Sequence, residues 1–345
     1  MGEFRPRPFP GIRRRRRAQA RALGDHHPPR HPVRAPTRVR ADQRRDSSRA
    51  REAPRRIAPD PVTPRVIAIH GLGLIGGSLG LALRARPDPP RVVGYDVDSG
   101  TARLALERGA VDALLSTPEM PDADTEIVVT AVPPRVALAL VPLLAEAMPR
   151  AAVLTDLSSV MLPALTSVSA KPETRRRFVG SHPLCGSEQG GIRAAREDLY
   201  RGAPVIVGGP LDPGSPAERI GSMWSLVGAR PSAMAPALHD ALVALTSHLP
   251  QVASTGLVRT LRRTGNMTGM LAQGAGPGLK DMSRLAASPA DLWFEILTLN
   301  ADKVTPALEL FEREIRGLRQ AIERKDPELR TLLEEAREFR REIAP

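Results

Sequence analysis

The segment GLGLIGGSLG at residues 71–80 constrains the fold more than any other part of the chain. It sets Gly71, Gly73 and Gly76 in a G-x-G-x-x-G pattern directly after the apolar run RVIAIH at residues 65–70. In this pattern the first glycine permits a tight turn, the second lets the backbone approach a pyrophosphate, and the third permits close packing of the helix. The segment therefore predicts a strand, a glycine turn and a helix whose first N–H groups face a dinucleotide.

One acidic residue and one loop complete the expected cofactor site. Asp96 lies 20 residues after Gly76, near the end of a second apolar run, RVVGYDVD. A carboxylate there accepts hydrogen bonds from the ribose hydroxyls and repels a 2′-phosphate, which favours NAD over NADP. The expected cofactor-binding residues are Gly71, Leu72, Gly73, Leu74, Ile75, Gly76, Asp96, Val132 and Pro133.

The pattern of the chain changes near residue 235. Before it, apolar strands alternate with helical segments, which predicts parallel β-α-β units in a doubly wound sheet of the Rossmann type. After it the periodicity is helical, and the last 20 residues are expected to form a charged helix with little apolar stripe. We therefore expect an α/β dinucleotide-binding domain over residues 63–235, followed by an all-α substrate and dimerisation domain over residues 236–345. The helices expected there span residues 236–262 with an interruption at Pro250, 266–273, 279–287 and 290–324.

The excess charge of the chain lies in its first 60 residues. The whole sequence has a net charge of +12, and residues 1–60, with 18 arginines and 6 acidic residues, account for all of it. Residues 1–62 are predicted to be disordered, because an arginine- and proline-rich segment with few apolar residues cannot form a core. The role of this tail stays open between a solvated leader or extension, which we favour, a polyanion-binding arm and an organellar transit peptide. The remainder is electrically balanced, so nucleic-acid binding is not expected.

The single cysteine and the hydropathy bear on the compartment. Cys185 is the only cysteine, which excludes an internal disulfide and favours a reducing compartment. The sequence has no apolar run of membrane-spanning length and no secretory signal with an apolar centre. We expect a soluble cytoplasmic protein without a membrane partner, and the sequence predicts no metal site.

Two polar segments follow later strands of the expected sheet. GSHPLCGSEQGG at residues 180–191 holds His182 in a glycine-flanked loop, and TDLSSV at residues 155–160 follows a buried strand. Ligands bind at the carboxyl ends of the strands in such sheets. Histidine is also the side chain whose proton affinity is closest to neutral pH. The combination indicates a proton acceptor beside a nicotinamide ring, and therefore an oxidation.

Two segments of the helical part carry further polar side chains. LHDALVALTSHLP at residues 238–250 contains His239, interpreted as structural and hydrogen-bonded to Asp240, and also His248. GAGPGLKDMSRLAASPADLW at residues 274–293 contains Lys280, Asp281 and Arg284. Lys280 and Arg284 are four residues apart, so we expect them on one helical face near the start of the helix. Cations there oppose the helix dipole, which indicates an anionic partner.

In their order along the chain, these segments resemble the prephenate dehydrogenase family, which includes arogenate and cyclohexadienyl dehydrogenases. The resemblance covers residues 63–322 and depends on the full set GLGLIGGSLG, GYD, TDxxSV, GSHPxxGSExxG, SHLP and GxGxKDxxRxA. It implies an oxidative decarboxylation in tyrosine biosynthesis. A cyclohexadienol passes its C4 hydride to NAD, loses its ring carboxylate as carbon dioxide and becomes a phenol. Prephenate is the expected substrate, arogenate or both substrates are the alternative, and the family implies a homodimer through the helical domain.

The resemblance also implies roles for individual residues. His182 would accept the proton of the C4 hydroxyl, and Ser159, with Ser158 as the alternative, would hydrogen-bond that hydroxyl or His182. Arg284 would bind a substrate carboxylate through its planar guanidinium group. The remaining residues are Ser187, His248, Trp293 and Lys280 for the substrate pocket, and Glu188 and Asp281 for the domain interface.

Other classes of protein fit the sequence less well. β-Hydroxyacid dehydrogenases usually rely on a lysine and asparagine pair at the start of the helical domain, and residues 236–262 contain neither residue type. A nucleotide-sensing or nucleic-acid-binding protein would have to use the arginine-rich tail. An inactive NAD-binding relative is not expected to retain His182, Ser159 and Arg284 together.

Overall fold

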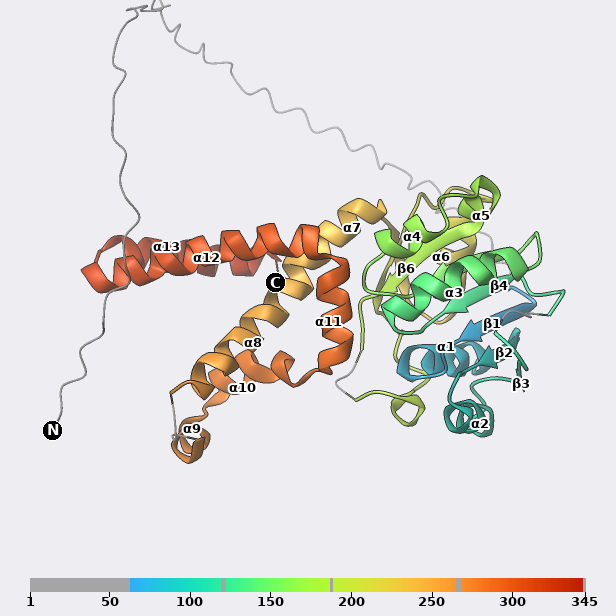
Figure 1. Ribbon diagram of the computed structural model, residues 1–345, viewed down its shortest axis with the longest axis horizontal. Coiled ribbons are helices and arrows are strands. Elements are labelled where there is room, and N and C mark those ends of the chain that lie inside the picture. The colour runs from blue at the N-terminus through green and yellow to red at the C-terminus, as the bar shows by residue number, and fades with distance from the viewer. Residues whose placement is uncertain (1–62, 119–121, 187–188, 265–267, 344–345) are drawn as a thin grey trace, which may run out of the picture. The chain divides into compact units, whose positions relative to one another are not determined.

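The computed structural model describes residues 63–118, 122–186, 189–264 and 268–343. Within these ranges the chain forms a sheet with helices on it, followed by a helical part (Figure 1). The arginine-rich tail, residues 1–62, lies outside the described residues, and so do Ser187 and Glu188.

The described strands form one sheet in the order β3-β2-β1-β4-β5-β6-β7-β8. From β3 to β6 all neighbours are parallel, which confirms the predicted doubly wound sheet of the Rossmann type. β7 departs from the expectation because it runs antiparallel to β6, while β8 is parallel to β7. The strands are β1 (Val66–His70), β2 (Arg91–Tyr95), β3 (Ala113–Leu114), β4 (Ile127–Thr130), β5 (Val153–Asp156), β6 (Phe178–Pro183), β7 (Pro204–Val207) and β8 (Arg230–Ala233).

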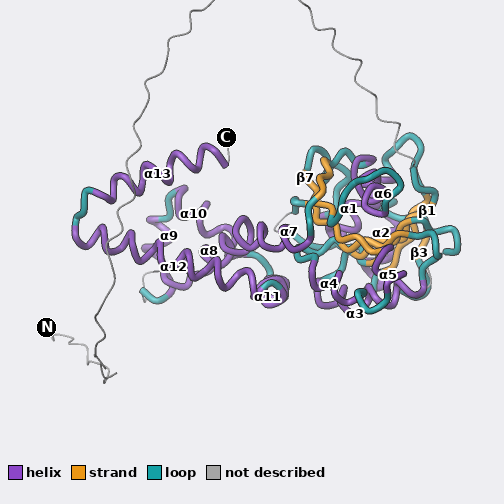
Figure 2. Tube along the Cα trace, turned by 90° about the horizontal axis from the view of Figure 1, so that it is seen from above, coloured by secondary structure: helices purple, strands orange, loops and turns teal. Residues whose placement is uncertain are grey.

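Helices cover both faces of the sheet (Figure 2). Successive strand residues point to opposite faces, so Ile67 and Ile69 belong to one core, while Val66 and Ala68 belong to the other. The first core includes residues of α1 (Leu74–Arg84), α2 (Ser99–Glu107) and α6 (Pro216–Leu226). The second includes residues of α3 (Pro134–Ala147) and α4 (Leu162–Ser167), and α5 (Pro172–Arg177) packs beside α3. Burial on both faces explains why the strands are almost continuously apolar.

The helical part contains α7 to α13. The expected helix 236–262 is interrupted by a π-helical turn next to the predicted break at Pro250, whereas the division of the expected helix 290–324 at Asn300 was not predicted. The helices and turns are α7 (Pro236–Val243), the π turn (Ala244–His248), α8 (Leu249–Arg262), α9 (Thr268–Gly274), α10 (Pro277–Ser283), a 3-10 turn (Arg284–Ala287), α11 (Ala290–Leu299), α12 (Ala301–Arg324) and α13 (Glu328–Ile343).

The expectation of little apolar stripe on the last helix is wrong. In α13 the apolar residues Leu329, Leu333, Ala336, Phe339 and Ile343 recur every three or four positions, which places them on one face. A count of charges alone hid this spacing, because polar residues occupy all the other positions of the helix except Leu332.

Two fully buried aromatic side chains support the part of the sheet that carries the polar loops. The Tyr200 hydroxyl donates to the carbonyl oxygen of Ile75 at 2.6 Å, at the start of α1. The indole N–H of Trp224 donates to Ser181 Oγ at 3.0 Å, one residue before His182. The two rings lie 5.0 Å apart between centroids in a tilted edge contact. Both aromatic residues therefore pack in the core.

Substitution of Trp224 tests this support. We expect Trp224→Phe to lower the free energy of unfolding by about 1–3 kcal/mol, because it opens a cavity and removes the indole N–H that donates to Ser181. Leu106→Ala in α2 is the control, since Leu106 is partly exposed and its truncation should cost about 0.5 kcal/mol. Urea denaturation at pH 7 measures both losses. Equal losses would contradict the supporting role of Trp224.

Candidate active site

The three glycines of the glycine turn differ in what surrounds them. Gly71 has φ +90°, and a Cβ there would lie 2.5 Å from the carbonyl oxygen of Ala131 at the end of β4. A Cβ on Gly76 would overlap the carbonyl oxygen of Gly71, whereas a Cβ on Gly73 would meet nothing within 4 Å. The first and third glycines therefore serve the close packing of β1, β4 and α1. The second faces open space, as a position approached by a ligand should.

Asp96 fixes the turn from the end of β2. Its two carboxylate oxygens accept hydrogen bonds from the backbone N–H of Leu72, at 2.8 Å, and of Asp98, at 3.0 Å. The carboxylate is half-buried, so it still has an open side. The sequence predicted the position of Asp96 but not its bond to the turn.

Two cavities lie on either side of the loop after β4. The first, about 560 Å³, is lined by Gly71, Gly73 and Asp96 with apolar residues of α3. The second, about 380 Å³, is lined by Leu74, Ile75, Ser158, Ser159, Gly190, Pro289 and Leu292. Ala131, Val132 and Pro133 line both. Their position between β1 and β4 is the point where the strand order reverses, which is where open α/β sheets bind dinucleotides.

Seven of the nine expected cofactor residues line these cavities. The other two, Leu72 and Gly76, are buried behind the turn. The open space at Gly73, the uncapped first turn of α1 and the free side of Asp96 fit a dinucleotide with a 2′-hydroxyl.

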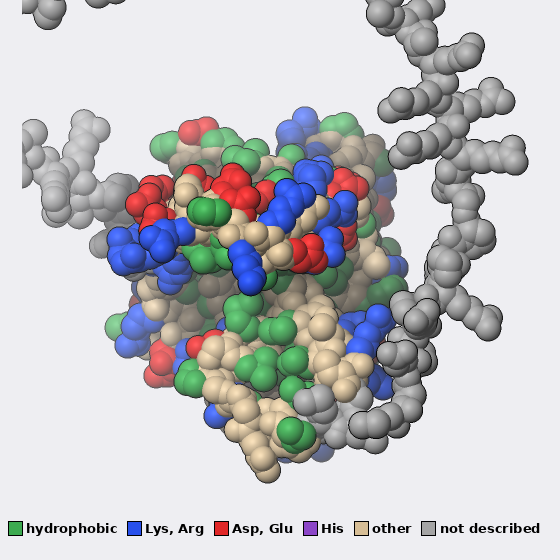
Figure 3. Space-filling view, turned by 90° about the vertical axis from the view of Figure 1, so that its left-hand side faces the viewer, with side chains coloured by type: hydrophobic (Ala, Val, Ile, Leu, Met, Phe, Trp, Pro, Cys, Tyr) green, Lys and Arg blue, Asp and Glu red, His purple; other side chains and the backbone are tan. Residues whose placement is uncertain are grey.

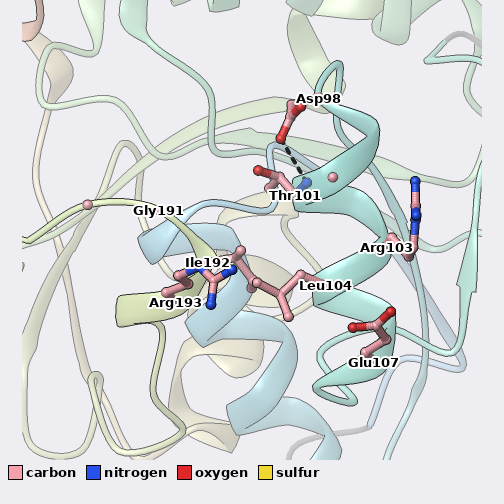
Figure 4. A pocket seen from close by; sticks show the side chains of 10 residues that line it. Asp98, Thr101, Arg103, Leu104, Glu107, Gly191, Ile192 and Arg193 are labelled. Atoms are coloured by element: carbon pink, nitrogen blue, oxygen red, sulfur yellow. Dashed lines mark hydrogen bonds between the residues drawn. The ribbon is translucent and has the colours of Figure 1, made fainter.

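A further hollow of about 550 Å³ lies between α2 and residues 190–193 (Figure 4). Asp98 caps α2 there by accepting from the N–H of Thr101 at 2.8 Å, and Leu104 points toward Ile192. None of the residues expected for catalysis lines it. It therefore adds no chemistry to the two cavities.

His182 lies at the end of β6 in a chain of hydrogen bonds. Its Nδ1 is 2.9 Å from Nε2 of His239, and Nδ1 of His239 is 2.8 Å from Oδ1 of Asp240. His182 is half-buried, while His239 and Asp240 are fully buried in α7. The hydrogen bond expected between His239 and Asp240 is thus present, and it continues to His182.

Asp240 and Asn300 connect this chain to two other elements. The carboxylate of Asp240 accepts from the backbone N–H groups of Met161, at 2.8 Å, and Leu162, at 2.9 Å. Asn300 Nδ2 donates to the carbonyl oxygen of Asp240 at 2.9 Å and lies 3.2 Å from Nδ1 of His248. Asn300 was not predicted as a site residue, because the sequence around it predicts an uninterrupted helix over residues 290–324.

His248 and Trp293 lie next to each other, as expected for residues of one pocket. Their ring centroids are 6.0 Å apart in a T-shaped contact. His248 is fully buried, and among the described residues its Nε2 has no hydrogen-bond partner. This buried nitrogen is therefore left without a partner among the described residues.

Burial keeps His182 and His248 neutral at pH 7. Together with repulsion from the neighbouring His239 and His248, burial lowers the pKa of His182 to about 3. Burial also lowers the pKa of His248 to about 4, against the opposing attraction of Asp240. An uncharged imidazole at pH 7 is the form that accepts a proton.

Ser158 and Ser159 follow β5 and line the second cavity. The backbone N–H of Ser158 donates to Asp156 at 3.2 Å, and Thr130 donates to the same carboxyl group at 2.7 Å. Burial raises the pKa of Asp156. In the part of the chain that the structure describes, no hydrogen bond joins Ser159 to His182, so their predicted contact stays a prediction.

The predicted position of the two cations was wrong in part. Lys280 lies in the last turn of α10, and Arg284 begins the 3-10 turn after it, so neither opposes the dipole at a helix start. Both side chains are exposed, as is Asp281. The argument from the dipole therefore fails, although the cations themselves remain free to bind an anion.

The turn that carries Arg284 is held against α8. Gln251 Nε2 donates to the carbonyl oxygen of Leu285 at 2.9 Å, and Ser254 Oγ accepts from the N–H of Ala286 at 3.0 Å. Gln251 and Ser254 are three and six residues after His248, which corresponds to roughly 5 and 9 Å along a helix. The Arg284 turn and His248 are therefore neighbours along α8.

A second contact brings α11 to the cavities. Glu295 accepts from the backbone N–H of Arg135 at 3.0 Å, which satisfies an unpaired N–H in the first turn of α3. The Arg135 side chain donates to Thr298 at 3.1 Å and lies over the ring of Phe294, 5.6 Å from its centroid. The start of α11 thereby supplies Pro289 and Leu292 to the second cavity.

A dinucleotide site at the switch point, with buried neutral imidazoles at the same edge of the sheet, defines a nucleotide-dependent dehydrogenase. Residues 79–232 match the family model described as the nucleotide-binding domain of prephenate dehydrogenase. Residues 235–337 match the model of its dimerization domain. The chain belongs to the prephenate dehydrogenase family.

Relatives in the family carry different substrate names. A cyclohexadienyl dehydrogenase of Zymomonas mobilis is 31% identical over 267 residues, which cover 75% of this chain and 89% of the relative. The solved prephenate dehydrogenase of A. aeolicus, in complex with hydroxyphenyl propionate and NAD+, is 29% identical with a TM-score of 0.71, covering 81% of this chain and 98% of that one. The Synechocystis arogenate dehydrogenase is 27% identical with a TM-score of 0.65, covering 81% and 100%.

The described residues contain neither of two features, a membrane-spanning helix or a cluster of metal ligands. No helix among them is long and apolar enough to cross a membrane. The same residues contain no group of three or more histidine, cysteine or acidic side chains arranged to hold a metal ion.

The neutral histidines predict an acid-sensitive fold. The unfolded chain protonates its histidines near pH 6.5, whereas folded His182 and His248 do so only at about pH 3 and 4. The free energy of unfolding should therefore be highest above pH 7 and fall by several kcal/mol as the pH drops from about 6.5 toward 4. Urea denaturation at pH 7 and pH 5 measures the loss. His248→Gln should reduce this loss of stability. An undiminished loss in that variant would contradict the contribution of His248 to the acid sensitivity.

The glycine turn predicts two opposite outcomes for the same substitution. Gly73→Ala should fold with normal stability and bind dinucleotide about tenfold or more weakly, because the new methyl group enters the open space. Gly76→Ala should instead destabilise the fold, since its methyl group meets the Gly71 carbonyl oxygen. Thermal unfolding and calorimetric titration with NAD measure the two effects. Equal behaviour of the variants would count against the separate roles of the two glycines.

Proposed function

We propose that the chain is an NAD-dependent prephenate dehydrogenase, which converts prephenate to 4-hydroxyphenylpyruvate with loss of carbon dioxide. The observation that carries the proposal is the neutral imidazole of His182 at the edge of the sheet where the glycine turn opens. This geometry suits removal of a hydroxyl proton while a hydride leaves the neighbouring carbon.

NAD, when bound, supplies the hydride acceptor of the reaction. The N–H groups at the start of α1 receive its phosphates, and the open side of Asp96 receives the ribose hydroxyls. A 2′-phosphate would lie against the same carboxylate, so NADP is disfavoured.

His182 is the proposed base, and its neutral state supports the assignment. Ser159 is proposed to bind the C4 hydroxyl or His182 from the cavity that it lines, with Ser158 as the alternative. The hydroxyl of Ser158 supports that alternative, because it is buried and lacks a hydrogen-bond partner among the described residues.

The substrate carboxylates need cations near the base. Arg284 is proposed to bind one of them through two parallel N–H groups, with Lys280 adding positive charge. His248 and Trp293 line the same pocket in this proposal, and the buried Nε2 of His248 is the donor it offers. Ser187 is proposed for the substrate pocket, and Glu188 and Asp281 for the domain interface, by family resemblance alone.

The side chain of the substrate separates prephenate from arogenate, which carries an ammonium group. The two buried carboxylates of this region, Asp156 and Asp240, are each engaged by hydrogen bonds from the protein. Among the described residues, neither of these two carboxylates is left to pair with an amine, which supports prephenate, with its pyruvyl group, as the proposed substrate. The similarity to a cyclohexadienyl dehydrogenase keeps dual specificity as the second candidate.

A homodimer through the helical domain, taken as residues 236–345, completes the proposal. Apolar side chains gather on the face of this domain in Figure 3, with acidic and basic side chains beside them. Large apolar surfaces of this kind commonly mark an interface. Exposed apolar residues of the domain include Val258, Met270, Met282, Leu310, Ile315, Ile322, Leu333, Phe339 and Ile343.

The proposed activity is tested with the full chain, NAD and either prephenate or arogenate, by following the absorbance of NADH. His182→Asn should lower kcat about 10²–10⁴-fold with little change in substrate binding, because it removes the base. Arg284→Ala should raise KM about 10–100-fold, because it removes a charge-assisted bond.

Arg150→Ala is the matched control for Arg284, since Arg150 is exposed and lies just before β5, at the opposite edge of the sheet. It should behave as the unchanged protein. Normal turnover by His182→Asn would rule out the proposed base, and absence of NADH with both substrates would rule out the proposed function.

A further inference from the structure

The hydrogen-bond chain from Asp240 through His239 to His182 has no part in the roles proposed above. We infer that Asp240, acting through His239, fixes the proton of His182 on Nδ1 and so leaves Nε2 of His182 as the proton acceptor. The inference rests on the proposed function, because it assigns two positioning residues to the base of that reaction.

Asp240 determines which atom donates and which accepts in each hydrogen bond from Asp240 to His182. An ionised carboxylate only accepts hydrogen bonds, and that of Asp240 receives backbone N–H groups from Met161 and Leu162. These donors stabilise its negative charge in a site without solvent. The contact of 2.8 Å from Nδ1 of His239 to Oδ1 is therefore a donation by His239.

The next two positions follow from the chemistry of neutral imidazole, which has one donor and one acceptor nitrogen. With its proton on Nδ1, His239 presents Nε2 as an acceptor. The 2.9 Å contact with His182 then requires His182 to donate from Nδ1. Nε2 of His182 is left with a lone pair and without a proton, which is the form a base needs.

Asn300 fixes the proton of the neighbouring His248 on the other ring nitrogen, Nε2. Its Nδ2 donates to the carbonyl oxygen of Asp240, which identifies this atom as the nitrogen of the amide. The same amide nitrogen lies 3.2 Å from Nδ1 of His248, so Nδ1 of His248 accepts and Nε2 carries the proton. Asp240 thus fixes the proton of His182 through its side chain and His239. It fixes the proton of His248 through its backbone carbonyl and Asn300.

The arrangement also serves the proton transfer. When the O–H bond of the substrate breaks, its proton forms an N–H bond at Nε2 of His182, and the ring becomes a cation. The lone pair of His239 then accepts a hydrogen bond from that cation. The negative charge of Asp240, on the far side of His239, stabilises the positive charge. In a buried site such a chain stabilises developing charge more than water would.

The first test is spectroscopic and needs no substrate. The full chain, labelled with ¹⁵N-histidine, is measured at pH 7 by NMR, in which couplings to the ring protons distinguish protonated from bare ring nitrogens. We expect Nδ1–H at His182 and His239 and Nε2–H at His248, with signals assigned from single His→Gln variants. A proton on Nε2 of His182 would overturn the inference, whether or not the protein oxidises prephenate.

The second test separates positioning from stability. His239→Leu removes the acceptor of His182 and should lower kcat about 100-fold while KM changes less than about twofold. His239→Gln offers an amide oxygen in its place and should recover much of the loss. Val243→Ala is the control, because Val243 is buried on the same helix and is not part of the hydrogen-bond series from Asp240 to His182.

The outcomes are distinct from a failure of the proposed function. If His239→Leu turns over like Val243→Ala, or if Gln and Leu at position 239 are equally slow, the positioning role is overturned. If the unchanged protein oxidises neither substrate, the proposed function fails, and the NMR measurement still decides the proton positions.

Discussion

The buried carboxylate of Asp240 is the interaction on which the arrangement of the site depends. It receives hydrogen bonds from α4 and from His239, and its own backbone accepts one from Asn300 at the start of α12. A charge held in the interior without such partners costs several kcal/mol, so α4, α7 and α12 are constrained to meet around it. The sheet and the helical part are thereby joined at the residue that also orders the histidines.

The parallel sheet contributes a second constraint, because it gathers the chemistry at one edge. β1, β2, β4, β5 and β6 all end there, and they carry the glycine turn, Asp96, the Val132-Pro133 loop, Ser159 and His182 respectively. The close approach of Gly71 to Ala131 narrows the gap between β1 and β4, and the two cavities open on either side of the loop after β4. The residues proposed for the cofactor and for the base are thus placed at one edge of the sheet by strand direction, before any helix of the second part is added.

The helical part then supplies what the sheet lacks. α7 and the π turn bring His239 and His248 to His182, α8 holds the Arg284 turn through Gln251 and Ser254, and α11 is fixed to α3 by Glu295. Burial keeps His182 and His248 neutral, whereas Lys280 and Arg284 are exposed. Such a division suits a reaction in which a neutral base acts on a substrate that carries two negative charges.

The sequence alone determined the doubly wound sheet, the glycine turn, Asp96 and the glycine-flanked position of His182, because apolar periodicity and glycine spacing are local properties. The antiparallel entry of β7, the break at Asn300 and the position of Lys280 at a helix end were decided only by tertiary packing. The same holds for the bonds that join Asp240 to Met161, Leu162 and Asn300, which are 60 to 79 positions away in the sequence. Hydrogen-bond direction depends on which groups meet in the folded interior, and no local pattern in the sequence specifies that meeting.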